Sequence, residues 1–232
     1  MVGDGEGGDE TTAVDAAAEH AILERLRGIA GTTIVSEEIG MVGDGPLRIV
    51  VDPIDGSLNA KRGIPFFSVS IAVAEGETMD DVVFGYVYDF GSGEEWVAEK
   101  GKGALLNGAG LGETRPKEEI EILSFEATLT SSVAEKAASV VGLAYRLRIM
   151  GSLALSLCHL AAGRVDGVCS LKPARSVDIA AAQLLVRERG LAIELPEAPP
   201  FGAAPLDVQG RSRVVAGATS EVCERLFTAL SR

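Results

Sequence analysis

The pattern of apolar residues changes near residue 115, and this change constrains the fold more than any other feature of the sequence. Before it, strand-like runs follow one another with short glycine-containing turns between them, which is typical of an antiparallel sheet. After it, strand-like and helix-like runs alternate, which predicts crossover connections and a largely parallel sheet. The polar segment 112–119 suits a linker. We therefore predict an antiparallel-sheet α+β half, residues 1–114, and an α/β half, residues 115–232.

The periodicity and the turn signals also predict individual elements. In the first half we expect a mobile or disordered start over 1–10, then a helix over 15–27 with Thr11 and Thr12 as N-cap candidates. The strands expected there cover 32–35, 47–51, 66–74, 82–89 and 95–99. In the second half we expect strands over 120–125, 145–150, 165–170, 191–195 and 213–216, and helices over 132–143, 152–162, 177–189 and 220–230. A proline-rich surface loop is expected at 196–205.

Charge and composition exclude several classes of partner. The formal net charge is −13, which argues against binding to a nucleic-acid backbone or an anionic membrane, since both require basic surface. No apolar run reaches the roughly 18 residues that a membrane span requires. The three cysteines have neither disulfide-like nor metal-ligand spacing, which fits a reducing cytoplasm. A phosphate substrate remains compatible with an acidic protein if carboxylates hold divalent cations.

The segment from Asp52 to Ser57 follows a hydrophobic strand directly. Its two carboxylates stand three residues apart with a proline between them, and they could converge on one cation or bridge two. Oxygen ligands of this kind suit Mg²⁺. If a helix begins after Gly56, its free N–H groups form an anion site beside the cations. The same residue types are favoured in turns, so the segment by itself leaves a structural turn open.

Three further acids could join this segment, and each also has a structural explanation. Glu37 ends the preceding strand and could stand beside Asp52 in a sheet. Asp178 interrupts an otherwise apolar helix start, where it could cap the helix or project toward cations. Asp15 lies in the first helix, where a solvated face is equally available.

Taken together and in order, these segments resemble the inositol monophosphatase family, within the larger group that includes fructose-1,6-bisphosphatases. The matching segments cover nearly the whole chain: 11–15, 36–38, 50–59, 64–70, 101–104, 107–108, 151–155, 162–167 and 177–181. The resemblance implies the layered αβαβα sandwich of this family, with a metal site between the two halves. It also implies a Mg²⁺-dependent phosphatase of small phosphorylated metabolites.

The resemblance further implies a set of metal ligands. Glu37, Asp52 and the carbonyl of Ile54 would hold a first Mg²⁺. Asp52, Asp55 and Asp178 would hold a second, and Glu37 would reach a third through water.

Catalytic and substrate-binding roles follow from the same resemblance. Ser57, paired with Asp15, would help to deprotonate the attacking water, and Glu37 joins them as a catalytic residue. The substrate-binding residues expected are Asp55, Gly56, Ser57, Gly151, Ser152, Arg175 and Asp178. We expect no phosphoenzyme, because His20 and His159 lie in predicted helices as surface or core residues and no cysteine falls in the site.

Four departures from the family pattern bear mainly on the substrate. Only about ten residues precede Thr11 and they contain no lysine, so we expect an incomplete lid or a true start further upstream. Val177 stands where the family usually has a tryptophan, and Ser57 stands where it has a threonine after Asp-Gly. Leu171 stands where animal enzymes have an acid that contacts inositol. Nearby, Lys172 and Arg175 would suit a second phosphate, although they could equally be solvated bases.

The candidate substrates are therefore inositol monophosphate and fructose 1,6-bisphosphate. A 3′-phosphoadenosine 5′-phosphate phosphatase and a non-catalytic metal- or phosphate-binding relative remain as alternatives. A homodimer and sensitivity to lithium are expectations from the family alone.

Overall fold

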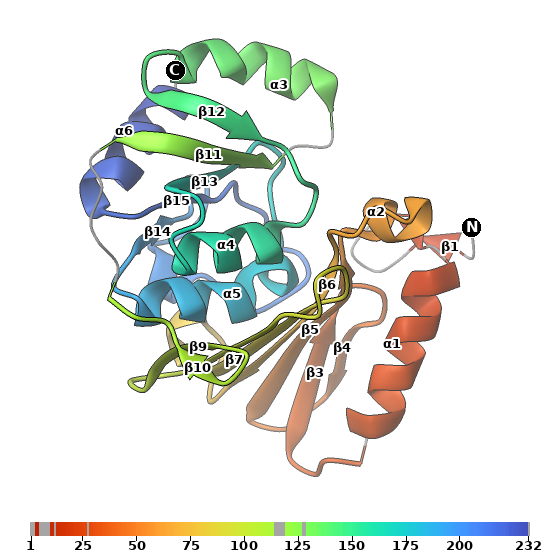
Figure 1. The fold of residues 1–232 in the computed structure, drawn as a ribbon. Coiled ribbons are helices and arrows are strands. Elements are labelled where there is room, and N and C mark those ends of the chain that lie inside the picture. The colour runs from red at the N-terminus through yellow and green to blue at the C-terminus, as the bar shows by residue number, and fades with distance from the viewer. Residues whose placement is uncertain are drawn as a thin grey trace.

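The protein is described by a computed structural model, which covers residues 3–4, 10–11, 13–26, 28–113, 119–126 and 129–231. Figure 1 shows five layers of alternating helices and sheets. Helix α1 (Ala13–Leu26) lies outside an eight-stranded sheet, and α4 (Leu153–Ala161) and α5 (Ser176–Glu188) lie between that sheet and a five-stranded one. Helices α3 (Thr130–Ala137) and α6 (Ser220–Leu230) cover the far side. The predicted αβαβα sandwich is confirmed.

The first sheet is built from residues of the first half, in the order β10-β9-β8-β7-β6-β5-β3-β4. Its strands are β3 (Thr32–Ser36), β4 (Gly40–Gly43), β5 (Leu47–Asp55), β6 (Ser68–Ala74), β7 (Val82–Asp89), β8 (Glu95–Glu99), β9 (Gly103–Leu106) and β10 (Ala109–Gly110). All neighbours are antiparallel except β3 and β5. That pair is parallel because the chain passes through β4 at the sheet edge before it returns as β5. Strands β4, β9 and β10 were not predicted, because they are short and rich in glycine.

The second sheet has the order β12-β11-β13-β15-β14. Its strands are β11 (Ile120–Glu126), β12 (Ala144–Arg148), β13 (Gly167–Ser170), β14 (Ala192–Glu194) and β15 (Val215–Gly217). β11 is parallel to β12 and β13, but β15 is antiparallel to both of its neighbours. The expectation of a largely parallel sheet is therefore corrected at β15. The chain reaches β15 from β14 through a loop with one short turn, η3 (Phe201–Ala203), and without the crossover helix that would keep its direction.

Several element boundaries differ from the prediction. The helix expected over 132–143 is α3 followed by a short 3₁₀ segment, η2 (Ala138–Val140), and a second 3₁₀ segment, η1 (Met79–Asp81), precedes β7. A short helix, α2 (Ser57–Arg62), begins after Gly56. Within the expected disordered start, β1 (Gly3–Asp4) pairs with β2 (Glu10–Thr11), and residues 1–2 and 5–9 lie outside the described residues. The N-cap candidate Thr12 and residues 114–118 of the expected linker lie outside the described residues, and the boundary between the halves stays a prediction.

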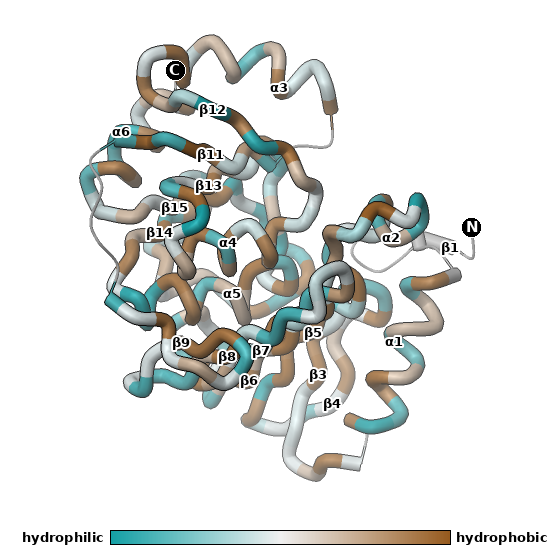
Figure 2. Tube along the Cα trace, in the orientation of Figure 1, coloured by the Kyte–Doolittle hydropathy of each residue, from teal (hydrophilic) through white to brown (hydrophobic). Residues whose placement is uncertain are grey.

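The main hydrophobic core lies around α4 and α5, between the two sheets. Figure 2 shows brown, hydrophobic stretches along the eight-stranded sheet and mixed colours on α1. Helix α5 packs very closely on this sheet at Gly85 of β7, where a Cβ would lie 2.5 Å from the carbonyl oxygen of Ala181. This close packing sets the position of α5, which carries Asp178 at its first turn. In the described part of the chain, no helix combines the length and the apolar surface needed to cross a membrane.

Candidate metal and phosphate site

Residues from both halves line a cavity of about 270 Å³. One wall comes from the ends of β3 and β5 and from the start of α2, and it includes Glu37, Asp52 and Asp55. The other wall comes from the second half and includes Glu126 and Gly151. The cavity thus brings together residues from widely separated parts of the chain.

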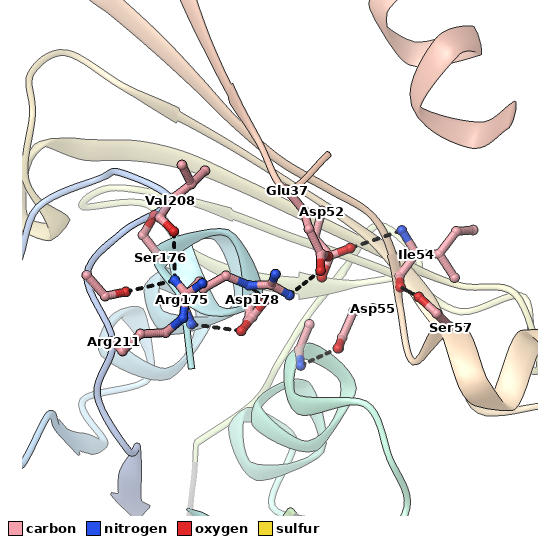
Figure 3. A network of polar contacts seen from close by, with 12 residues as sticks. Glu37, Asp52, Ile54, Asp55, Ser57, Arg175, Ser176, Asp178, Val208 and Arg211 are labelled. Atoms are coloured by element: carbon pink, nitrogen blue, oxygen red, sulfur yellow. Dashed lines mark hydrogen bonds and ion pairs between the residues drawn. The ribbon is translucent and has the colours of Figure 1, made fainter. Parts of the chain in front are cut away.

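Three carboxylates from three separate segments meet at this cavity. Ser36, the last residue of β3, is the parallel partner of Val51, so Glu37 just beyond β3 stands beside Asp52 within β5. Asp178 approaches from the first turn of α5. One carboxylate oxygen from each of Glu37, Asp52 and Asp178 lies within 4.8 Å of the others. Figure 3 shows this convergence of two strands and one helix start.

Burial and mutual repulsion make the ionised form of these acids unfavourable. Burial raises the pKa of Glu37 to about 7, with Arg175 acting against the shift and Asp178 adding to it. The pKa of Asp52 is raised well above its usual value by burial and by the charges of Glu37 and Asp55. Burial also raises the pKa of Asp55 to about 7, although its hydrogen bond from Ser152 opposes the change. The cluster therefore requires nearby positive charge to ionise near neutral pH.

Part of that positive charge comes from Arg175, whose side chain is 9% exposed. Its Nη2 contacts Oε1 of Glu37, and its Nε lies 3.3 Å from Oδ1 of Asp178 (Figure 3). Its backbone N–H also donates to Oδ2 of Asp178 at 2.8 Å. Asp178 therefore has both roles left open by the sequence, because it caps the start of α5 and faces the cluster. Arg175 also lines the cavity, and its expected role in binding substrate phosphate stays a prediction.

The carboxylate of Asp55 forms hydrogen bonds with residues of the second half of the protein. Its Oδ2 accepts hydrogen bonds from the Ser152 hydroxyl at 2.5 Å and from the Ala154 backbone N–H at 2.7 Å, at the start of α4. Ser152 is itself buried and also accepts from the N–H of Leu155 at 3.2 Å. Gly151 lines the cavity, but the Ser152 hydroxyl, expected to face substrate, binds Asp55 instead.

The segment between the two aspartates is held by its own hydrogen bonds. The N–H of Ile54 donates to Oδ1 of Asp52 at 3.0 Å, and the Ser57 hydroxyl donates to the Ile54 carbonyl at 2.9 Å (Figure 3). Gly56 has φ = 96°, the left-handed conformation that favours glycine, immediately before α2. Asp15 is buried and lies on the cavity wall. Its pairing with Ser57 stays a prediction.

Two buried glutamates support the site and were missed from the sequence. Glu126, at the end of β11, lines the cavity and accepts hydrogen bonds from Gly151 and two serines. Its signal was an acid directly after an apolar strand, as at Asp52. Glu19 of α1 accepts hydrogen bonds from the Ser36 hydroxyl at 2.5 Å and from the Ile39 N–H at 3.2 Å. It therefore binds both ends of the turn that carries Glu37. Its signal was the spacing of four from Asp15, which places both acids on one helix face.

Comparison with known proteins agrees with this fold. The model of the inositol monophosphatase family matches residues 2–232. A fructose-1,6-bisphosphatase/inositol-1-monophosphatase of Thermococcus kodakarensis is 38% identical over 191 residues, which are 82% of this chain and 71% of that protein. A protein of the same name from Methanothermobacter thermautotrophicus is 33% identical over 240 residues, covering 97% of this chain and 85% of the relative.

A solved structure extends this similarity to the arrangement of the whole chain. The crystal structure of an inositol monophosphatase–fructose 1,6-bisphosphatase has a TM-score of 0.87 and 29% identity to this chain. The match covers 99% of this chain and 88% of that one. The chain belongs to the inositol monophosphatase family.

Proposed function

We propose that this family phosphatase hydrolyses phosphate monoesters of small polyols or sugars, with Mg²⁺ bound at the cluster of Glu37, Asp52 and Asp178. The convergence of these three carboxylates within 4.8 Å, at a cavity with a helix start on its wall, is the observation that carries the proposal. Inositol monophosphate and fructose 1,6-bisphosphate are the leading substrates, because the names of the relatives above include both activities.

The donors present fit Mg²⁺. They are carboxylate oxygen atoms, which hard divalent cations prefer, from the buried Asp52 and the partly buried Glu37 and Asp178. We assign Glu37, Asp52 and the carbonyl of Ile54 to one ion, and Asp52, Asp55 and Asp178 to another, with a third reached from Glu37 through water. When bound, the ions would lower the pKa of a water molecule and neutralise charge on the leaving oxygen.

The chain's own groups would bind and orient the ester. The N–H groups of Gly56 and Ser57 would bind phosphate oxygens, since both residues line the cavity at the start of α2. Hydrolysis forms a bond from the water oxygen to phosphorus and breaks the ester P–O bond, and the leaving alcohol oxygen takes up a proton. The proton that the water loses passes toward the buried carboxylate of Asp15, with the Ser57 hydroxyl orienting the water.

Basic residues at the cavity favour a substrate with a second phosphate. Lys172 and Arg211 lie on its wall, on the side of the second half. Both can place positive charge near a phosphate that is remote from the metal cluster. This observation favours fructose 1,6-bisphosphate over an inositol monophosphate, and Lys172→Ala is expected to raise KM for the bisphosphate more than for the monophosphate.

The test is phosphate release from a substrate panel with Mg²⁺ and with EDTA. The panel contains inositol monophosphate, fructose 1,6-bisphosphate and 3′-phosphoadenosine 5′-phosphate, and Asp55→Asn is measured beside the wild type. We expect Mg²⁺-dependent release that Asp55→Asn reduces by about 100-fold, because it removes the negative charge of a proposed metal ligand. Release from no substrate, or release that Asp55→Asn leaves unchanged, would refute the proposal. Light scattering of the same sample would report whether the expected homodimer forms.

A further inference from the structure

The turn at residues 150–152 connects the proposed metal ligands to the second half of the protein. The Asn59 side-chain amide donates to the Met150 carbonyl at 2.7 Å. Two residues later, the Ser152 hydroxyl donates to Oδ2 of Asp55 at 2.5 Å. The turn therefore contacts the segment that contains Asp55 and the start of α2 at two points.

Glu126 holds the same turn from the opposite side. Its Oε2 accepts the Gly151 N–H at 2.8 Å, while its Oε1 accepts the hydroxyls of Ser124 at 2.8 Å and Ser156 at 2.7 Å. The residue is only 6% exposed, and both serines are fully buried. Because each carboxylate oxygen has its own donors, the orientation of the side chain is fixed, and Gly151 is held at one position relative to β11.

The packing around the turn leaves little room for it to move. Gly151 has φ = 90°, and a Cβ there would lie 3.0 Å from Nδ2 of Asn59. A Cβ at Gly56 would lie 3.0 Å from the carbonyl oxygen of Gly151. A shift of the turn would therefore displace Gly56 or Asn59, and with them the start of α2.

We infer that Glu126 is a positioning residue, which acts through Gly151 and Ser152 to hold the carboxylate of Asp55 in place for the divalent cation. The inference rests on the proposed function for the role of Asp55 in cation binding. It assigns to Glu126 a contribution to Mg²⁺ affinity that a purely structural anchor would not make. Partners that orient a metal ligand in this way typically contribute 10–100-fold in metal affinity or activity.

The test compares Glu126→Ala with a matched variant of Asp166, whose side chain binds the other end of β11. Asp166 is 5% exposed, and its Oδ2 accepts the N–H groups of Glu121 and Ile122 at 2.9 Å each, where β11 begins. Asp166→Ala therefore removes a comparable buried carboxylate that anchors backbone, away from the cavity. The Kd for Mg²⁺ is measured by isothermal titration calorimetry and the Tm by thermal unfolding with EDTA.

We expect both variants to lower Tm, but only Glu126→Ala to raise the Kd for Mg²⁺, by about tenfold or more. Ser152→Ala should raise the Kd in the same direction, and the double variant should bind little worse than Glu126→Ala, because both changes break one connection. Glu126→Gln should restore most of the affinity. Its carbonyl can accept from Gly151, and its amide can donate to a serine hydroxyl.

Equal Kd values for Glu126→Ala and Asp166→Ala would overturn the inference. So would a Glu126→Gln variant that loses as much affinity as Glu126→Ala, since charge rather than position would then be responsible. If Glu126→Ala does not fold, Ser152→Ala decides alone, and an unchanged Kd overturns the inference. If the variants show this pattern of Kd values but the wild type releases phosphate from no substrate, the proposed function is refuted and the positioning role stands.

Discussion

Arg175 places a permanent positive charge inside the proposed cation site, so its removal should have opposite effects on the metal-free and metal-bound proteins. Its guanidinium contacts Glu37 and Asp178, two of the three clustered carboxylates. Removing one partner of a buried ion pair costs about 3 kcal/mol, because the other charge is left uncompensated. For a chain of this size that corresponds to a Tm about 6–12 °C lower. We expect this loss for Arg175→Gln in EDTA at pH 8, which is above the pKa of about 7 of Glu37.

Mg²⁺ should reverse the order of the two proteins. The guanidinium repels or competes with a divalent cation at the same carboxylates, and two unit charges about 4 Å apart interact by about 4 kcal/mol at an effective dielectric constant of 20. Solvation and rearrangement offset much of this energy, so we expect Arg175→Gln to bind Mg²⁺ at least about tenfold more tightly, a change of about 1.4 kcal/mol. Added Mg²⁺ should then raise the Tm of the variant more than that of the wild type.

Thermal unfolding with EDTA and with Mg²⁺, together with calorimetric titration of Mg²⁺, measures both effects. Arg164→Gln is the matched control, because Arg164, just beyond the C-terminal end of α4, forms two hydrogen bonds of 2.6 Å to Glu94, which is not one of the three acids. It should lower Tm by less and leave the Kd for Mg²⁺ unchanged. If Arg175→Gln is as stable as the wild type in EDTA and binds Mg²⁺ no more tightly, Arg175 is not the counter-charge of the cluster.

Three other predictions follow from the same structure. The pKa values of Glu37 and Asp55 are raised to about 7 in the folded protein. The stability that their protonated forms contribute is therefore complete below about pH 4 and is lost as the pH rises to about 7. Tm in EDTA should fall over this range, and Mg²⁺ should remove the fall. Glu19→Ala should weaken Mg²⁺ binding by about tenfold, measured by calorimetry, because Glu19 holds the turn that carries Glu37. Gly85→Ala should lower the free energy of unfolding in urea by about 1–3 kcal/mol, because its Cβ would lie 2.5 Å from the Ala181 carbonyl oxygen.

The sequence predicted the layers and the acidic residues better than the ends of the elements. Helix 220–230 and strands 82–89 and 95–99 have the predicted bounds, because their apolar periodicity is clear and turn residues flank them. β5 was expected to end at Val51 but continues to Asp55, although Asp and Pro are unfavourable in strands. The pairing of β5 with β6 shifts register between Asp52 and Asp55, and such an irregularity accommodates Pro53, which has no N–H to donate.

The contacts of the acids could not be predicted because they depend on residues far apart in the chain. Spacing within a segment placed Glu37 beside Asp52, since two strand ends can be aligned from sequence. No local pattern indicates that Arg175 reaches Glu37, or that Ser152 reaches Asp55 across 97 positions. Those contacts follow from how closely α4 and α5 pack against the first sheet.

The two central helices explain how the fold can keep so many acids buried. Asp178 lies in the first turn of α5, and Asp55 accepts the Ala154 N–H in the first turn of α4. The positive end of each helix dipole therefore faces a carboxylate, and each such arrangement contributes about 0.3–2 kcal/mol. Asp52 has no such helix contact among its hydrogen bonds above, and its pKa is raised by burial and by the charges of its acidic neighbours. The second half of the protein thus supplies more than Asp178: its helix starts, and Arg175 between them, lower the cost of gathering the acids before any divalent cation binds.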